Sequence, residues 1–129
     1  MKTFRVGTSR REQMLDVTES IRDAVRAAGV DEGICLVFSP HTTCGVTVNE
    51  GWDPAVQADA LQLTRELIPQ ERQFEHSEGN SDSHIKSMFM GASALLPVSR
   101  GELKLGRWQA IFLCEFDGPR ERQVWVTVR

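Results

Sequence analysis

The clearest pattern along the chain is an alternation of apolar and polar positions, which is typical of half-buried strands. It runs through 45–49, where Thr47 separates Val46 from Val48, and through 123–128. Shorter runs predict further strands at 3–6, 13–17, 94–98, 103–105 and 108–116.

The run 33–38 has a different pattern, because its residues GICLVF form one continuous apolar stretch. A continuous apolar run of strand length predicts a strand that is covered on both faces. Turn-forming residues at 99–101 and 117–120 predict hairpin-like connections between the later strands.

Three helices are predicted between the strands. The first begins at Asp16 and Glu19, which resemble a capping box. The second begins at Asp53-Pro54, because Asp is a good N-cap and Pro suits the first helical position. The helices end near Gly29, Pro69 and Gly91. Their apolar stripes are Val17, Ile21, Val25 and Ala28; Val56, Ala60, Leu63 and Leu67; and Ile85, Met88 and Phe89.

Strands at both ends, helices between them and no regular βαβ alternation favour an α+β fold. We expect a β-rich domain with a mostly antiparallel sheet or sandwich and two or three helices. A chain of 129 residues has the usual length of one domain, so residues 1–129 are expected to form a single unit.

Charge and composition exclude some partners. The formal net charge is −3 and the arginines are scattered, so the chain lacks the clustered basic surface that nucleic acids require. No apolar run approaches the roughly 20 residues that span a bilayer, and the N-terminus has no apolar signal region. Three cysteines without CxxC spacing suit a reducing compartment, so we expect a cytoplasmic protein without a structural disulfide.

All three histidines, His41, His76 and His84, lie in polar stretches in the middle of the chain. Neutral imidazole is a common ligand of transition ions, and three such ligands leave a coordination position open for water or substrate. Their spacing matches no short zinc motif such as HExxH. Two interpretations stay open: a three-histidine site for a divalent ion, or three surface or otherwise satisfied side chains.

The stretch 78–87 is a second candidate for chemistry. A glycine-containing turn that leads into a helix presents free backbone N–H groups, and Ser83, Lys86 and Ser87 add donors and a positive charge. These are the components of a phosphate site. An ordinary loop with a polar residue as helix cap fits the same residues.

Four other side chains are candidates. Glu50 is free either to orient a metal ligand or to act as a general base, because Asp53 nearby is explained as an N-cap. Cys44 is either a nucleophile paired with a histidine or, as the strand pattern favours, an interior residue that lines the site. Arg107 and Arg120 are anion-binding forks or solvated turn residues.

Two strings of the chain resemble a known family. HTTCGVTVNEGWDP and HSEGNSDSHIKSMFMGASALLPVSRGELKLGRWQAIFLCEFDGPR are similar, in content and order, to the YjbQ-like proteins, which are described as secondary thiamine-phosphate synthases. The resemblance spans nearly the whole chain and implies a β-rich α+β fold and a homotrimer. It departs from the family at Arg107, where relatives often have threonine, so no family-wide role is given to that residue.

The resemblance also implies the components of a site. It implies a divalent metal ion, and the histidine ligands favour zinc or a similar transition ion over magnesium. The implied metal ligands are His41, His76 and His84; the implied catalytic residues are Glu50 and Lys86; and the implied cofactor-binding residues are Asn80, Ser81 and Ser87.

The implied activity joins a hydroxymethylpyrimidine pyrophosphate to a thiazole phosphate and releases pyrophosphate. Such a reaction needs positive charge at the departing oxygens, donors around the phosphates and a pocket that excludes water. Magnesium usually prefers carboxylate and water ligands, so the histidines fit this chemistry imperfectly and two alternatives stay open. One is a metal-dependent phosphoester hydrolase, and the other is a non-catalytic trimeric binding module for a phosphorylated metabolite.

Overall fold

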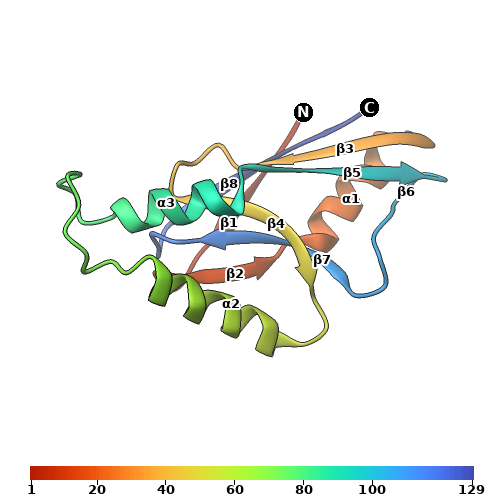
Figure 1. The fold of residues 1–129 in the computed structure, drawn as a ribbon. Helices are drawn as coiled ribbons and strands as arrows, with labels where there is room; N and C mark the ends of the chain where they lie inside the picture. Colours follow the sequence, from red (N-terminus) through yellow and green to blue (C-terminus); the bar gives the residue numbers. More distant parts are fainter.

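Two antiparallel sheets form the frame of the protein in the computed structural model, which describes all 129 residues (Figure 1). The larger sheet has the strand order β1 (Lys2–Gly7), β8 (Glu121–Val128), β3 (Glu32–Phe38), β5 (Ser93–Ser99) and β6 (Glu102–Leu103). The smaller has the order β2 (Gln13–Asp16), β7 (Gln109–Glu115) and β4 (Cys44–Glu50). With the helices α1 (Thr18–Ala28), α2 (Pro54–Leu67) and α3 (Ser81–Met90), they confirm the predicted α+β fold.

The main hydrophobic core lies between the two sheets, and α1 packs against it with Ile21. Alternate strand residues point inward, so that Val37 of β3 and Val124 and Val126 of β8 are buried. Burial of each such side chain stabilises the fold by about 1.5–3 kcal/mol. The alternating pattern of 123–128 therefore predicted the inner face of β8 correctly.

A second core covers the other face of the smaller sheet. Phe112, Cys114 and Phe116 are buried there, and Leu61 of α2 and Met90 of α3 pack against them. The middle strand β7 is therefore buried on both faces. This packing brings the start of α3 next to the end of β7, where the polar residues gather.

Local signals explain the limits of α1. The N-cap is Val17, one residue later than predicted, and it has no side-chain cap; Asp16, at the end of β2, still accepts the backbone N–H of Thr18 at 2.9 Å. Glu19 does not complete a capping box, since it lies 3.4 Å from Arg22 instead. Gly29 ends the helix with a φ of 66°, a left-handed conformation that glycine adopts without strain.

The predicted two-sided cover of β3 is wrong within a single chain. The main core and α1 cover the face that carries Cys35 and Val37, whereas Ile34 and Leu36 on the opposite face are 48% and 38% exposed. A run of apolar residues shows only that both faces avoid water. It does not show whether the same chain or another chain covers them.

The apolar stripe of α2 is also left exposed. The helix begins as predicted, because the side chain of Asp53 accepts the N–H of Ala55 at 2.9 Å. No residue of α2 is fully buried, and Leu63 and Leu67 are 54% and 69% exposed. None of the three helices is long and apolar enough to cross a bilayer.

Candidate functional site

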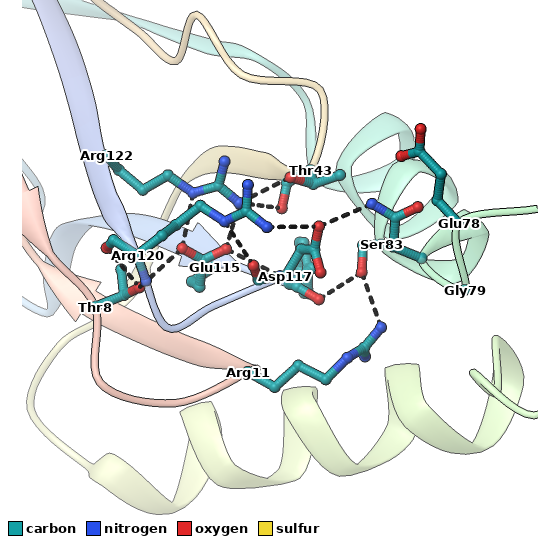
Figure 2. A network of polar contacts seen from close by, with 12 residues as sticks. Thr8, Arg11, Thr43, Glu78, Gly79, Ser83, Glu115, Asp117, Arg120 and Arg122 are labelled. Carbon is teal, nitrogen blue, oxygen red and sulfur yellow. Dashed lines mark hydrogen bonds and ion pairs between the residues drawn. The ribbon is translucent and has the colours of Figure 1, made fainter.

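Polar side chains gather where β7 ends and β4 begins. The register pairs Glu115 with Cys44, so the loops before β4 and after β7 lie at the same end of the smaller sheet. The start of α3 reaches this place, because Ser83 donates its hydroxyl to the carbonyl of Phe116 at 2.5 Å. We call the polar contacts there the Glu115 network (Figure 2); its members are Thr8, Thr43, Asn80, Glu115, Asp117, Arg120 and Arg122.

Glu115 and Arg122 form the centre of this network, and both are buried. Arg122 donates Nε to one carboxylate oxygen at 2.7 Å and Nη2 to the other. Thr8 and the backbone N–H of Asp117 donate to the same carboxylate at 3.0 and 2.9 Å. Arg122 also donates to the hydroxyl of Thr43 at 2.8 Å. The carboxylate accepts four hydrogen bonds, which makes a buried ion pair tolerable.

These contacts fix two charge states. Burial alone would raise the pKa of Glu115, but hydrogen bonds from Arg122 and from the N–H of Asp117 outweigh it and hold that pKa below its ordinary value. Burial, together with the positive charge of Arg122, lowers the pKa of His41. At neutral pH the ionised carboxylate of Glu115 therefore lies close to the neutral imidazole of His41, which is next to the network.

His41 has one ring nitrogen occupied. Its Nε2 accepts the backbone N–H of Gln123 at 2.8 Å. In a neutral imidazole whose Nε2 accepts, the proton is on Nδ1, so the ring presents a hydrogen-bond donor and no free lone pair. In this conformation His41 is therefore suited to bind an oxygen atom. Coordination of a metal ion by His41 would require the bond to Gln123 to be broken.

His76 and His84 come together from the loop before α3 and from its first turn. Their ring centroids are 5.2 Å apart and their planes meet at 88°. Two imidazoles bound at about 2.0–2.1 Å to one tetrahedral ion place their ring centres roughly 5 Å apart, so the pair fits a shared ion. Edge-to-face packing alone gives a similar separation. Glu78 lies close, with Oε2 at 3.6 Å from His76 Nε2.

The structure thus brings together two of the three predicted metal ligands. Within one chain, no three histidine, cysteine or carboxylate groups are placed to hold a single ion. A site built on His41, His76 and His84 stays a prediction, and one chain by itself provides only half of a tetrahedral coordination shell.

The start of α3 offers unpartnered hydrogen-bonding groups. Asn80 is at the N-cap position, but its side chain donates to Asp117 at 2.8 Å and caps nothing. The backbone N–H groups of Ser81 and Asp82 have no partner within the chain, and Asn80 Oδ1 is buried without one. Free N–H groups at the positive end of a helix dipole are an anion site. The phosphate interpretation of 78–87 stays a prediction.

Lys86 and Ser87 are not available at this end of α3. Lys86 is 1% exposed, and its Nζ lies 2.8 Å from Asp82 Oδ2 and 3.1 Å from Glu12 Oε1. Ser87 is buried and donates its hydroxyl to a carbonyl of the same helix at 2.9 Å. Residues two apart on a helix face different sides, so Lys86 points away from the side that carries His84.

Glu50 lies at the other end of β4. Six steps along the strand separate it from Cys44, which corresponds to about 20 Å. Its carboxylate accepts the backbone N–H groups of Trp52 and Asp53 at 2.6 and 3.4 Å, so it shapes the turn into α2. A single chain therefore does not bring Glu50 to the histidine pair.

The fold and the sequence have clear relatives. The family model described as UPF0047 protein YjbQ-like matches residues 2–129. The chain belongs to this family. It is 42% identical over 125 residues to UPF0047 protein MJ1081 of Methanocaldococcus jannaschii, with 97% of this chain and 91% of that protein covered. It is 41% identical over 127 residues to UPF0047 protein YugU of Bacillus subtilis, with 98% and 96% covered.

Solved structures agree with this assignment. A YjbQ/UPF0047 protein from Clostridium acetobutylicum matches with a TM-score of 0.98 at 42% identity, and a conserved hypothetical protein from Thermus thermophilus matches with 0.92 at 44%. Both pairs of chains are covered in full. The family resemblance is confirmed. The names of these relatives state no activity, so the thiamine-phosphate synthase assignment stays a prediction.

In this YjbQ-like protein, sequence reasoning missed the buried pair of Glu115 and Arg122. One signal was present: Glu115 is the only charged residue in the apolar run from Ala110 to Phe116. A charge inside a buried strand must have a partner, because an unpaired buried charge is very costly. Its partner follows seven residues later, on the adjacent end of β8.

Cys44 is the interior strand residue that the pattern favoured. It is buried, and burial raises the pKa of its thiol to about 12. A thiol with that pKa is not ionised at neutral pH and is a poor nucleophile. Arg107 lies elsewhere, with its guanidinium 4.8 Å from the ring centre of Trp108.

Proposed function

We propose that this protein is a metal-dependent enzyme that acts on a small phosphorylated substrate at the start of α3, with thiamine-phosphate synthase-like activity. The observation that supports it most is the approach of His76 to His84 on the same helical turn that leaves the N–H groups of Ser81 and Asp82 unpartnered. The imidazoles suit a transition ion, and the partly exposed N–H group of Ser81 suits a phosphate oxygen.

In the proposed reaction a thiazole nitrogen attacks the methylene carbon of the pyrimidine, the carbon–oxygen bond to pyrophosphate breaks, and pyrophosphate leaves. A divalent ion held by His76 and His84 would supply positive charge for the departing oxygens. The N–H group of Ser81 binds a phosphate oxygen, and that of Asp82, which is fully buried, adds only to the positive potential at this end of the helix dipole.

Arg120 of the Glu115 network and His41 beside it add donors to this proposal. Arg120 is half exposed, and its Nε and Nη2 are fixed on Asp117 at 2.8 and 3.0 Å, which leaves Nη1 for an anion. His41 contributes an Nδ1–H group, since Gln123 occupies its other nitrogen. Arg120 and His41 both lie next to the saturated pair of Glu115 and Arg122. Their side chains are therefore already in place and need little rearrangement when substrate binds.

Two predicted catalytic residues have different roles in this proposal. Lys86 holds α3 in place, because its ammonium group donates to the carboxylates of Asp82 and Glu12. With these hydrogen bonds made, Lys86 does not contact substrate. Ser87 helps to hold the same helix. Glu50 acts in the site only where a second copy of the chain brings it there, since it lies at the far end of β4.

We also propose that the protein is a cytoplasmic homotrimer. Its three cysteines are free, which supports a reducing compartment. Large apolar side chains are exposed on several surfaces, as expected for interfaces between copies. They are Ile34, Leu36 and Leu95 on the larger sheet, Leu63 and Leu67 on α2, and Met88 and Phe89 on α3. Light scattering should give three times the chain mass of 14.5 kDa, and a monomer would contradict the homotrimer.

The test of the activity uses purified protein loaded with Zn²⁺, the two precursors, and chromatographic detection of thiamine phosphate. Product should form, and the rate should fall at least about tenfold in His76→Ala and in His84→Ala. Gln62→Ala is the matched control, because Gln62 is exposed on α2 and bonds only to its neighbour Glu66; it should keep the wild-type rate.

Other outcomes distinguish the alternatives. Product formation that is unchanged in both histidine variants contradicts the proposed site. Release of inorganic phosphate from a simple phosphoester, with no joining of the two precursors, would show a hydrolase instead of a synthase. Saturable binding of the precursors with no product after long incubation would indicate the binding module.

A further inference from the structure

A polar cavity lies on another side of α3, between this helix, the end of α2 and the segment that leads into β2. Its volume is about 300 Å³, which is at the small end of ligand pockets. None of its lining residues is hydrophobic. They are Arg11, Glu12, Arg65, Gln70, Glu71 and Lys86.

One oxygen in this cavity has no partner. The side chain of Glu12 is 8% exposed, and its Oε1 accepts from Lys86 at 3.1 Å and from Arg11 at 3.4 Å. Its Oε2 is buried and accepts no hydrogen bond. A buried carboxylate oxygen without a donor is costly, so such an atom indicates a place for a donor from outside the chain.

Other groups of the cavity are uncommitted as well. Arg65 has its nearest carboxylate oxygen, Glu12 Oε2, at 3.8 Å, which is beyond hydrogen-bond range. Gln70 donates its Nε2 to a backbone carbonyl at 3.3 Å, so its Oε1 is free. Glu71 forms no ion pair. The cavity therefore presents three acceptor groups, from Glu12, Gln70 and Glu71, and the guanidinium of Arg65, whose 3.8 Å ion pair with Glu12 includes no hydrogen bond.

The charges of the cavity already balance. Arg11, Arg65 and Lys86 line it as three cations and Glu12 and Glu71 as two anions; Asp82, outside the lining, pairs with both Arg11 and Lys86 and adds the third anion. A ligand with a net charge would disturb this balance, whereas a neutral ligand with separated charges would keep it. The lack of hydrophobic lining excludes a ligand with a sizeable apolar part.

We propose that this cavity binds a small zwitterion, with its ammonium group on Glu12 Oε2 and its acid group on Arg65. An ammonium group has three N–H donors, which match the three acceptors of Glu12, Gln70 and Glu71. A guanidinium binds a carboxylate or a phosphate through parallel hydrogen bonds. The ligand chemistry is an amine and an acid on neighbouring carbon atoms, as in an α-amino acid or in an aminoalkyl phosphate.

The competing arrangement is closure of the cavity by the protein itself. A small rotation of Arg65 would bring its guanidinium onto Glu12 Oε2 and complete a salt bridge without any ligand. In that case neither charge would be left for a zwitterion. Binding measurements on variants of Arg65 distinguish the two arrangements, because this side chain is 52% exposed and its replacement should leave the fold intact.

The test is calorimetric titration of the full chain with glycine and with phosphoethanolamine, and separately with acetate and with methylammonium. At least one zwitterion should bind saturably, and acetate and methylammonium should bind at least about tenfold more weakly. Glu12→Gln and Arg65→Gln should each lower the affinity at least about tenfold. Arg26→Gln is the matched control: Arg26 is a helical arginine, 49% exposed, and should leave the affinity unchanged.

The two zwitterions also distinguish a carboxylate ligand from a phosphate ligand, according to which binds more tightly. Absence of saturable binding for both, or equal binding by Arg65→Gln and the wild type, would overturn the proposal. The test is independent of the proposed enzyme activity, because it uses neither precursor. A protein that makes thiamine phosphate but ignores both zwitterions removes only this inference.

Discussion

The two buried ion clusters on either side of α3 differ in completeness. In the Glu115 network, both oxygens of Glu115 accept hydrogen bonds, and Arg122 binds the carboxylate in a bidentate manner. In the cluster of Glu12, Lys86 and Asp82, one oxygen of Glu12 is buried without a donor.

This difference separates scaffold from binding site. A saturated buried pair has no capacity left for a ligand and serves to hold loops in place. An unsaturated buried pair has a polar atom without a hydrogen bond. A ligand that forms this hydrogen bond offsets the free-energy cost of burying that atom. The same contrast applies at the start of α3, where the unpartnered N–H groups of Ser81 and Asp82 lie beside the saturated network.

The largest expected effect comes from breaking the saturated pair. Glu115→Gln leaves the buried guanidinium of Arg122 without a counter-charge, which should lower the free energy of unfolding by about 3–5 kcal/mol. Unfolding of both proteins in guanidinium chloride measures this difference in the free energy of unfolding. Glu121→Gln is the control, since Glu121 is 64% exposed and its pair with Arg5 is wide at 3.8 Å; it should change stability by less than about 0.5 kcal/mol.

Acid should remove the same interaction gradually. The pKa of Glu115 is lower in the folded state than its ordinary value of 4.5, and that of Asp82 is lower than its ordinary 3.8. Their stabilisation is fully present above the ordinary values and is lost as pH falls through the lower, folded values. Denaturation midpoints of the wild type should therefore fall steeply below pH 4.5, and those of Glu115→Gln less steeply. Equal slopes would contradict an ionised Glu115.

A smaller effect is expected in the unsaturated cluster. Glu12→Gln should cost about 1.5 kcal/mol, because Lys86 keeps its shorter contact to Asp82 at 2.8 Å. The measurement is the same denaturation experiment. If Glu12→Gln costs as much as Glu115→Gln, the two clusters are equally complete in solution and the contrast between them fails.

The smallest effect should follow replacement of the buried thiol next to the network. Cys44→Ala removes one sulfur atom from the core and should cost about 1 kcal/mol. Thiamine phosphate formation should be unchanged, because burial keeps this thiol protonated. Loss of activity in a folded Cys44→Ala variant would make the cysteine a catalytic candidate again.

Much of the fold follows from the sequence because its signals are local. Alternation placed β4 and β8, and Asp53 with Pro54 placed the start of α2. The exposed stripe of α2 and the outer face of β3 were misjudged because hydrophobicity shows that a surface avoids water and does not name what covers it.

The sequence predicted which residue types make up the candidate site, but not how they are arranged in space. Histidines and a glycine turn pointed to the region around 78–87, and the pairing of His76 with His84 agrees with that. The hydrogen bond from Gln123 to His41 spans 82 positions, so no local pattern could show that this imidazole is occupied. The burial of Lys86 was hidden for a similar reason: its contact to Asp82 is local, but its contact to Glu12 spans 74 positions.

The most direct test of the proposed enzyme site is an anomalous-scattering map of crystals grown with zinc, recorded at its absorption edge. The account predicts a peak at about 2.0–2.1 Å from one nitrogen of His76 and one of His84, and no such peak in His84→Ala crystals. Wild-type crystals in which the two rings pack edge to face with no peak between them would contradict it.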